Sequence, residues 1–265
     1  MRIGALLAGA LIAATASAAE RCDPCRVGNG TYRVDTPAGW DGKSPLPVLM
    51  FLHGYGGEAA DVLNDEAVTA PAQALGFLLV APDGVNGAWS HQGAPSHLRD
   101  DRRFLQAVLA DVRRQFPVDA HRIMLGGFSD GASMVWDMAC FAPLGFAAFL
   151  PFSGGFWERM PTACTAPVNL RHVHGTTDTV VPMDGKRFAG HPGPAPIARG
   201  FTIWRETDRC EAEPGRSVTS GQLACEVWTC PTHHTLALCL HPNGHGMEPE
   251  WLEDGLRWAR DLPAQ

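Results

Sequence analysis

The stretch RIMLGGFSDGASMVW, from Arg122 to Trp136, decides the fold of this chain. It begins with a short apolar run, residues 123–125, of the kind that a buried strand carries. Residues 127–131 then match the pattern G-x-S-x-G, and residues 132–140 read as a helix. In a strand–turn–helix of this kind the serine stands at a sharp corner with its hydroxyl above the sheet edge. We therefore predict that Ser129 is a nucleophile.

The two glycines of this pattern, Gly127 and Gly131, carry a second expectation. A side chain at either position would collide at the point where the strand and the helix approach each other. The alternative interpretation is a structural turn with no chemical role, which also favours glycine.

Buried strands alternate with helices along the rest of the chain. Such alternation predicts an α/β fold with a mostly parallel sheet and helices on both faces. Only residues 153–168 lie between two of the strands where a lid could be inserted, so we expect no large lid domain and an open cleft. Apolar patterns predict strands at 32–37, 48–52, 77–80, 147–152, 169–173, 223–229 and 235–240, and helices at 59–75, 100–116, 197–207 and 251–262.

The first residues, 1–19, read as a signal peptide. Arg2 supplies the positive start, residues 3–14 are an apolar run, and residues 16–18 offer a small-residue cleavage site. The apolar run is short for a membrane span, although a retained anchor is the alternative. We predict that residues 20–265 form a single catalytic domain that is secreted or periplasmic and makes no membrane contact.

The net charge and the cysteine content indicate which partners and which cellular compartment to expect. The formal net charge of −7 argues against a nucleic-acid partner, because phosphate binding needs clustered Lys and Arg. Eight cysteines, an even number in a chain predicted to be exported, favour disulfides. Cys140 ends the predicted helix after Ser129 and Cys164 precedes the next strand, which suggests the pair Cys140–Cys164. A hairpin folded about position 232 would place Cys225 opposite Cys239, which leaves Cys210 to pair with Cys230. Cys22–Cys25 would form a short N-terminal disulfide.

Two pairs of histidines, at 172 and 174 and at 233 and 234, raise the possibility of zinc. His172 and His174 alternate along one strand and so share a face. No carboxylate or cysteine stands at a spacing that would close a zinc site, and histidines absorbed into the core and a loop are the favoured interpretation. We expect no metal and no cofactor.

Polar residues follow two further strands at their carboxyl ends, where α/β sheets bind ligands. Asp178 comes shortly after the strand at 169–173, and His245 follows the strand at 235–240. The order Ser129, Asp178, His245 is that of a hydrolase catalytic triad. Asp184 is a rival acid, but it lies further from the strand end.

The chemistry explains these residue types. A serine hydroxyl is a weak nucleophile, and His245 would take its proton while Asp178 holds the imidazole in the useful tautomer. Negative charge then develops on the substrate carbonyl oxygen, where fixed N–H groups stabilise it. We expect those donors to be the backbone amides of Asp130, directly after the nucleophile, and of Tyr55, in the loop after the strand at 48–52. A flexible turn is the alternative for that loop.

Five motifs occur in consistent order: HGYGG at 53–57, APDG at 81–84, GFSDG at 127–131, HGTTDTVVP at 174–182 and NGHG at 243–246. Together they resemble the secreted esterases of the polyhydroxybutyrate depolymerase and feruloyl or acetylxylan esterase group. The resemblance implies an α/β-hydrolase fold, no cofactor and a triad of Ser129, Asp178 and His245. Two departures are visible: Ala132 stands where many members carry glycine, and Gly246-Met247 replaces a common Thr-Trp-Pro. The second departure touches the expected wall of the substrate site.

Four apolar residues are candidates for the substrate cleft. Trp89, Phe156 and Trp157 follow strand ends, and Met247 follows His245. For the three aromatic residues, packing within their own loops is an equal alternative.

The sequence thus predicts a secreted serine esterase acting through an acyl-enzyme on polyhydroxyalkanoate-type polyesters or on feruloyl or acetyl esters of plant polysaccharide. One alternative is a serine peptidase of related fold, which the missing propeller-like domain disfavours. The other is an inactive polymer- or carbohydrate-binding protein.

Overall fold

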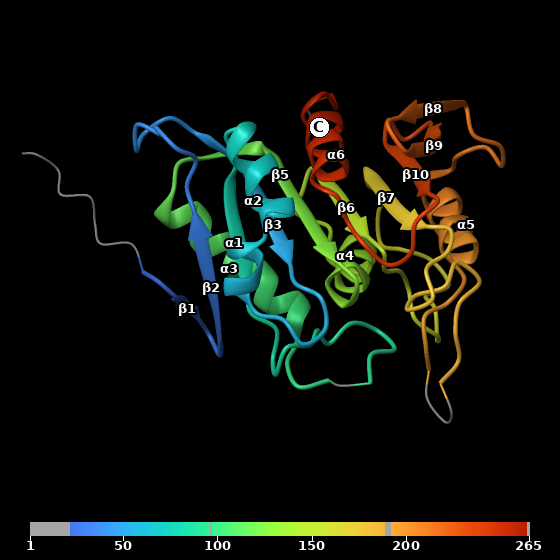
Figure 1. Cartoon of the computed structure of the whole chain (residues 1–265), viewed down its shortest axis with the longest axis horizontal. Coiled ribbons are helices and arrows are strands. Elements are labelled where there is room, and N and C mark those ends of the chain that lie inside the picture. The colour runs from blue at the N-terminus through green and yellow to red at the C-terminus, as the bar shows by residue number, and fades with distance from the viewer. Residues whose placement is uncertain (1–21, 96, 189–191, 264–265) are drawn as a thin grey trace, which may run out of the picture.

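A computed structural model describes residues 22–95, 97–188 and 192–263, so the predicted signal peptide lies outside the described residues. Ten strands form one sheet in the order β1-β2-β4-β3-β5-β6-β7-β10-β9-β8 (Figure 1). The strands are β1 Cys25–Val27, β2 Gly30–Asp35, β3 Leu46–Leu52, β4 Leu78–Pro82, β5 Val118–Phe128, β6 Ala148–Phe152, β7 Leu170–Gly175, β8 Arg216–Ser220, β9 Leu223–Thr229 and β10 Thr235–His241. The helices are α1 Ala59–Asn64, α2 Glu66–Ala74, α3 Asp101–Gln115, α4 Asp130–Phe141, α5 Ile197–Asp208 and α6 Pro249–Arg260.

The centre of the sheet is parallel and its two edges are antiparallel. Strands β4, β3, β5, β6, β7 and β10 pair in parallel, each with its neighbour. Strands β1 and β2 at one edge, and β9 and β8 at the other, pair antiparallel. The carboxyl ends of the central strands therefore meet at one edge of the sheet, which is the lower edge in Figure 1.

Helices cover both faces, which explains why β3, β4 and β6 are apolar throughout. Along β3, Val48, Met50 and Leu52 pack with α3, α4 and α5, whereas Leu49 and Phe51 pack with α1, α2 and α6. Side chains alternate between the faces of a strand, so a strand covered on both sides favours apolar residues at every position. The predicted α/β architecture is confirmed.

Two local predictions differ from the structure. The single helix predicted at 59–75 is wrong, because Asp65 adopts an extended backbone (φ −87°, ψ 111°) and its side chain accepts from the Ala67 N–H as the cap of α2. The edge strand β8 was not predicted, because its residues are exposed and mostly polar. Among the described strands it pairs with β9 alone, and apolar periodicity carries no signal for it.

Four disulfides join the same pairs that the spacing suggested: Cys22–Cys25, Cys140–Cys164, Cys210–Cys230 and Cys225–Cys239. The last pair lies directly opposite in the β9–β10 register, where Cys225 faces Cys239. Cys140–Cys164 fixes the segment between β6 and β7 to the end of α4.

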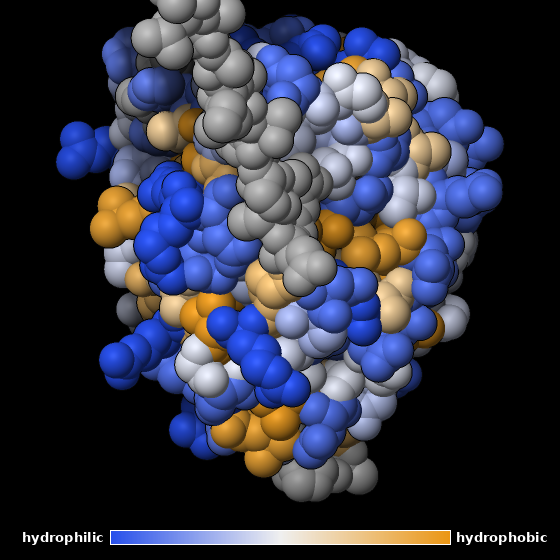
Figure 2. Space-filling model, turned by 90° about the vertical axis from the view of Figure 1, so that its left-hand side faces the viewer, coloured by the Kyte–Doolittle hydropathy of each residue, from blue (hydrophilic) through white to orange (hydrophobic). Residues whose placement is uncertain are grey.

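The surface at the β1–β2 end of the sheet is dominated by polar side chains, with apolar ones in separate patches (Figure 2). Of the helices in the described part of the chain, none has both the length and the apolar character that crossing a bilayer requires.

Asp208, at the end of α5, is a carboxyl group enclosed by the fold. Its side chain is fully buried, and neither oxygen has a hydrogen-bond partner within the described residues. Burial raises the pKa of this carboxyl from 3.8 to about 7, against a smaller lowering by the nearby Val168 backbone. Cys210 and Cys230 lie beside it, but they are joined to each other and so offer no thiolate to a metal.

The raised pKa predicts a pH-dependent stability that Asp208→Asn removes. Between about pH 4 and pH 7 the unfolded chain loses the Asp208 proton while the folded protein keeps it. The wild-type free energy of unfolding should therefore fall relative to that of the variant as pH rises, by up to about 4 kcal/mol. Urea unfolding of both proteins at pH 4.5, 6 and 8 measures this difference. A difference that stays constant with pH contradicts the prediction.

Candidate active site

Ser129 stands at the corner between β5, which ends at Phe128, and α4, which begins at Asp130. Its backbone has φ 56° and ψ −116°, which a side-chain-bearing residue rarely adopts. Such strain persists only where the surrounding structure holds it, and it is common at functional sites. The local conformation is the sharp turn that the sequence predicted.

The glycines on either side of Ser129 are required for the reason expected. A Cβ atom at Gly131 would lie 2.3 Å from the Leu52 carbonyl oxygen. A Cβ atom at Gly127 would lie 2.8 Å from the backbone of Gly131. The prediction that a side chain would collide at these two positions is confirmed.

The three predicted triad residues come together at the carboxyl edge of the sheet. His245 Nε2 lies 2.9 Å from Ser129 Oγ, and His245 Nδ1 lies 2.7 Å from Asp178 Oδ2. The residues come from three separate places: the end of β5, the turn after β7 and the loop after β10. A hydroxyl, an imidazole and a carboxylate in this order can generate a serine nucleophile.

The Asp178 carboxylate is held by the turn that follows β7. Its side chain is fully buried. Its Oδ1 accepts hydrogen bonds from the backbone N–H groups of Val180 and Val181, at 2.8 and 2.9 Å. His174 Nε2 lies 3.5 Å from Oδ2, the oxygen that also faces His245. These donors stabilise negative charge on the carboxylate.

Ser153 is a site residue that the sequence reasoning missed. It directly follows β6, is fully buried and has a positive φ of 54°. Its hydroxyl donates to the Gly246 carbonyl oxygen at 3.1 Å, which ties the loop carrying His245 to the end of β6. Its place at a strand end was an available signal, because the other polar site residues were recognised in that way.

The expected oxyanion donors lie on both sides of Ser129. The Asp130 amide belongs to the first turn of α4, where the helix dipole favours negative charge. In the loop after β3, the N–H groups of Gly56 and Gly57 donate to the carbonyls of Gly87 and Gly54. For the backbone N–H groups of Tyr55 and Asp130, no hydrogen-bond acceptor occurs in the described parts of the chain. Both remain available to a substrate oxygen.

The loop bearing Tyr55 is fastened to its neighbours by buried polar contacts. The Gly84 N–H donates to His53 Nε2 at 2.9 Å, and Trp89 Nε1 donates to the His53 carbonyl at 2.9 Å. The Asp130 carboxylate accepts from the Trp89 N–H at 2.9 Å and lies 3.1 Å from His91 Nε2. The side chain after the nucleophile thus anchors the loop opposite.

A cleft of about 610 Å³ opens beside Ser129. Its walls are mainly apolar and come from the loops after β3, β4, β6 and β7. Trp89 and Trp157 both contribute to it as predicted, although Trp89 is almost fully buried. The further lining residues include Tyr55, Val85, Leu98, Val181, Phe188 and Pro194.

Two of the predicted cleft residues lie elsewhere. Phe156 is a core residue, since its ring packs against Trp136 at 4.8 Å and Trp204 at 5.6 Å between centroids. The prediction that it walls the cleft is wrong, because the chain turns inward after Gly155. Met247 lines a separate hollow of about 340 Å³ with Phe128, on the other side of the Tyr55 loop.

The cleft is covered in part from a place that the sequence did not suggest. Residues 153–168, the expected position of any lid, contain no helix. Instead, the segment between β7 and α5 brings Phe188, Pro192 and Pro194 to the cleft. This segment pairs with the residues after β6, where Glu158 N–H donates to the Gly193 carbonyl at 2.9 Å.

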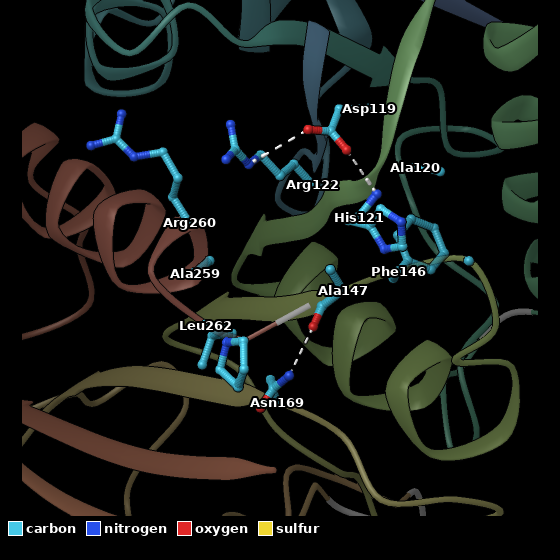
Figure 3. A pocket seen from close by; sticks show the side chains of 12 residues that line it. Asp119, Ala120, His121, Arg122, Phe146, Ala147, Asn169, Ala259, Arg260 and Leu262 are labelled. Atoms are coloured by element: carbon cyan, nitrogen blue, oxygen red, sulfur yellow. Dashed lines mark hydrogen bonds and ion pairs between the residues drawn. The ribbon is translucent and has the colours of Figure 1, made fainter. Parts of the chain in front are cut away.

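A third cavity, of about 530 Å³, lies at the opposite edge of the sheet (Figure 3). It is polar, with Asp119, His121, Arg122 and Arg260 around it, and Asn169 donates to the Ala147 carbonyl in its wall. No residue of the triad lines it.

Comparisons with known proteins agree with this geometry. Residues 97–189 match the family model described as Phospholipase/Carboxylesterase, a segment that contains Ser129 and Asp178 but ends before His245. The chain is 28% identical over 195 residues to a probable feruloyl esterase C of Aspergillus niger, covering 67% of this chain and 69% of that protein. It is 29% identical over 162 residues to feruloyl esterase C of Emericella nidulans, covering 58% and 57% of the two chains. The chain thus spans little more than half the length of this second relative.

Solved structures confirm the fold. An acetyl xylan esterase from Aspergillus awamori superposes with a TM-score of 0.64 at 14% identity, covering 88% of this chain and 94% of that one. The Bacillus cereus carboxylesterase gives 0.56 at 15% identity, covering 89% and 95%. The predicted α/β-hydrolase fold and the resemblance to feruloyl and acetylxylan esterases are confirmed.

The close approach at the elbow predicts a large effect of Gly131→Ala on stability. The new methyl group would meet two backbone carbonyls, of Leu52 and His53, which cannot move without shifting β3. We expect a loss of about 3 kcal/mol or more in the free energy of unfolding, measured by urea denaturation. Gly215→Ala is the matched control, because its nearest neighbour would be 3.8 Å away. Equal stability of the two variants would contradict this interpretation of the elbow.

Proposed function

We propose that this carboxylic ester hydrolase of the α/β-hydrolase fold is an exported serine esterase that works through an acyl-enzyme. The observation that carries the proposal is the unbroken chain of contacts from Ser129 Oγ through His245 to Asp178, at 2.9 and 2.7 Å. These contacts lie next to a cleft large enough for the acyl part of an ester.

The reaction divides into two halves with the same groups. Ser129 Oγ attacks the ester carbonyl carbon while His245 Nε2 takes the hydroxyl proton, and the carbonyl electrons move to the oxygen. The tetrahedral intermediate then collapses, the ester C–O bond breaks, and the alcohol leaves with the proton from His245. A water molecule next attacks the acyl-enzyme, with His245 again as base, and releases the acid and Ser129.

The protein groups around Ser129 support each step. Asp178 accepts from His245 Nδ1, so it favours the tautomer whose Nε2 is free to take a proton. The amides of Tyr55 and Asp130 are the proposed oxyanion donors, and such a donor is worth on the order of 3 kcal/mol in the transition state. Because these groups are fixed by backbone, little reorganisation is needed as charge develops.

The cleft favours esters with a bulky apolar or aromatic acyl group. Of the six large apolar side chains that are exposed in the described residues, four line the cleft: Tyr55, Leu98, Val180 and Phe188. Trp157 adds an indole ring whose neighbours are His91 and Phe188. A feruloyl ester, the substrate class named for the curated relatives, suits such walls, whereas an acetyl group would leave them unused.

Export is supported by two features. The signal-like residues 1–19 precede the catalytic domain proposed for residues 20–265. Four disulfides persist best in an oxidising compartment, outside the cytosol.

Replacement of the nucleophile tests the proposed mechanism. Ser129→Ala should lower kcat on p-nitrophenyl acetate by a factor of roughly 10³ or more and leave the unfolding transition in place. It should also abolish labelling by a fluorophosphonate, which reacts with activated serines. Ser217→Ala, on the exposed strand β8, is the matched control and should behave as wild type. Wild-type protein without esterase activity would favour the inactive binding protein instead.

Removal of the indole ring at Trp157 tests the proposed substrate class. Trp157→Ala should lower kcat/KM for methyl ferulate about tenfold, since an aromatic contact of roughly 1–2 kcal/mol is lost. Hydrolysis of p-nitrophenyl acetate should change little, because an acetyl group does not reach the ring. Leu144→Ala removes an exposed apolar side chain outside the cleft and is the control. An unchanged preference, or faster hydrolysis of polyhydroxybutyrate than of methyl ferulate by the wild type, would contradict the feruloyl assignment.

A further inference from the structure

Three side chains behind Asp178 form a buried chain of hydrogen bonds that the proposed mechanism does not use. Trp136 Nε1 on α4 lies 3.3 Å from His172 Nδ1 on β7, and His172 Nε2 lies 2.9 Å from His174 Nδ1. His174 Nε2 in turn lies 2.8 Å from the Val181 carbonyl oxygen. All three side chains are fully buried.

The two ends of this chain fix the direction of every bond in it. An indole N–H can only donate, so His172 Nδ1 must accept from Trp136. A neutral imidazole carries one proton, and that of His172 therefore sits on Nε2 and is donated to His174 Nδ1. The proton of His174 is then on Nε2, where the Val181 carbonyl can only accept it. Each ring donates once and accepts once.

The same argument excludes the charged form of His174. As an imidazolium it would donate from both nitrogens and force His172 to accept at Nε2. The proton of His172 would then lie on Nδ1 and face the Trp136 N–H. Burial also favours the neutral forms, because it lowers the pKa of His174 and holds the pKa of His172 well below its usual value. The neighbouring His174 lowers the pKa of His172 further, whereas a hydrogen bond to the Pro151 backbone raises it in part.

The chain ends on the groups that hold Asp178. The Val181 carbonyl accepts from His174, while the Val181 N–H donates to Asp178 Oδ1 at 2.9 Å. His174 Nε2 also lies 3.5 Å from Asp178 Oδ2. His174 thus holds Val181 through its carbonyl, while the N–H of the same residue donates to one Asp178 oxygen and the His174 ring lies beside the other oxygen.

We propose that the chain Trp136–His172–His174 is a positioning relay, in which a neutral His174 fixes Val181 and, through the Val181 N–H, the Asp178 carboxylate that orients His245. This inference rests on the proposed serine mechanism. A cation at position 174 would compete with the imidazolium that forms at His245 during the reaction, since both would face Asp178 Oδ2. A neutral donor orients the carboxylate and does not oppose that charge.

Other titratable groups near Asp178 must be considered in any pH experiment. Among the described residues they are His241 on β10, which stacks on Trp251 at 4.0 Å, and Lys186, which donates to the Thr179 carbonyl. The pKa of His241 is lowered by burial and by His174, with Asp178 opposing. The lowered pKa favours the neutral form of His241, as it does for His172 and His174.

Nuclear magnetic resonance of the wild-type protein, labelled with ¹⁵N at its histidines, tests the relay without reference to turnover. We expect His172 and His174 to remain neutral from pH 5.5 to 8.5, each with its proton on Nε2. An Nδ1-protonated or charged His174 in the wild type overturns the proposal.

Kinetics of His174→Phe and His174→Gln test the positioning role. Phenylalanine keeps the shape but no N–H, and we expect kcat on p-nitrophenyl acetate to fall about tenfold or more with KM within about twofold. The acidic limb of the kcat/KM profile should move to higher pH, because Asp178 loses the nearby polar N–H of His174 and holds the imidazolium of His245 more strongly. Glutamine supplies an amide N–H near the Nε2 position and should restore part of kcat.

Phe201→Leu controls for disturbed packing, because Phe201 contacts the His172 ring at 6.1 Å between centroids and takes no part in the hydrogen bonds. It should lower Tm but keep kcat per fluorophosphonate-titrated site within about twofold. If His174→Phe also keeps kcat and the pH profile, the relay fails while the serine mechanism stands. If Ser129→Ala retains activity, the serine mechanism itself fails.

Discussion

Parallel pairing of β3, β5, β6, β7 and β10 is the constraint on which the rest of the structure depends. Parallel strands end at the same edge of a sheet, so the loops that leave them lie side by side however far apart they are in sequence. Ser129 and His245 are 116 positions apart, and strand register brings their reactive atoms to 2.9 Å. The same edge receives Ser153 from β6 and the Tyr55 loop from β3. Because each of these groups lies shortly after a strand, its position is fixed by the hydrogen-bonded sheet.

That rigidity requires polar groups to be buried, and each one needs a partner. An unpartnered carboxylate in the interior costs several kcal/mol, whereas Asp178 is surrounded by two amides and two imidazoles. Asp208 illustrates the opposite case, because neither of its oxygens has a partner among the described residues and its pKa is raised to about 7. The fold surrounds one buried acid with hydrogen-bonding groups, whereas burial without a partner among the described residues favours the neutral form of the other.

Local sequence signals predicted the sheet and the triad because the two depend on the same pattern. Apolar runs locate the buried strands, and polar residues just after them mark the edge at which ligands bind. Asp178 and His245 were found in this way. Ser153 follows the same rule and was missed, since a single serine carries no motif. The relay behind Asp178 could not be inferred, because alternation along β7 places His172 and His174 on one face but does not say that Trp136 lies opposite.

The shape of the cleft could not be predicted from the apolar pattern of the sequence. Its walls come from loops after four different strands, and each loop is shaped by contacts that no periodic pattern encodes. Trp157 and Phe156 are adjacent in sequence, yet one lines the cleft and the other packs in the core. The deciding contact is the pairing of Glu158 with Gly193, from a segment more than thirty residues away. In this chain the reactive centre is therefore set by the sheet, whereas the shape offered to a substrate is set by pairing between loops. The two can change independently, because Phe188, Pro192 and Pro194 line the cleft without belonging to a strand end that carries the triad.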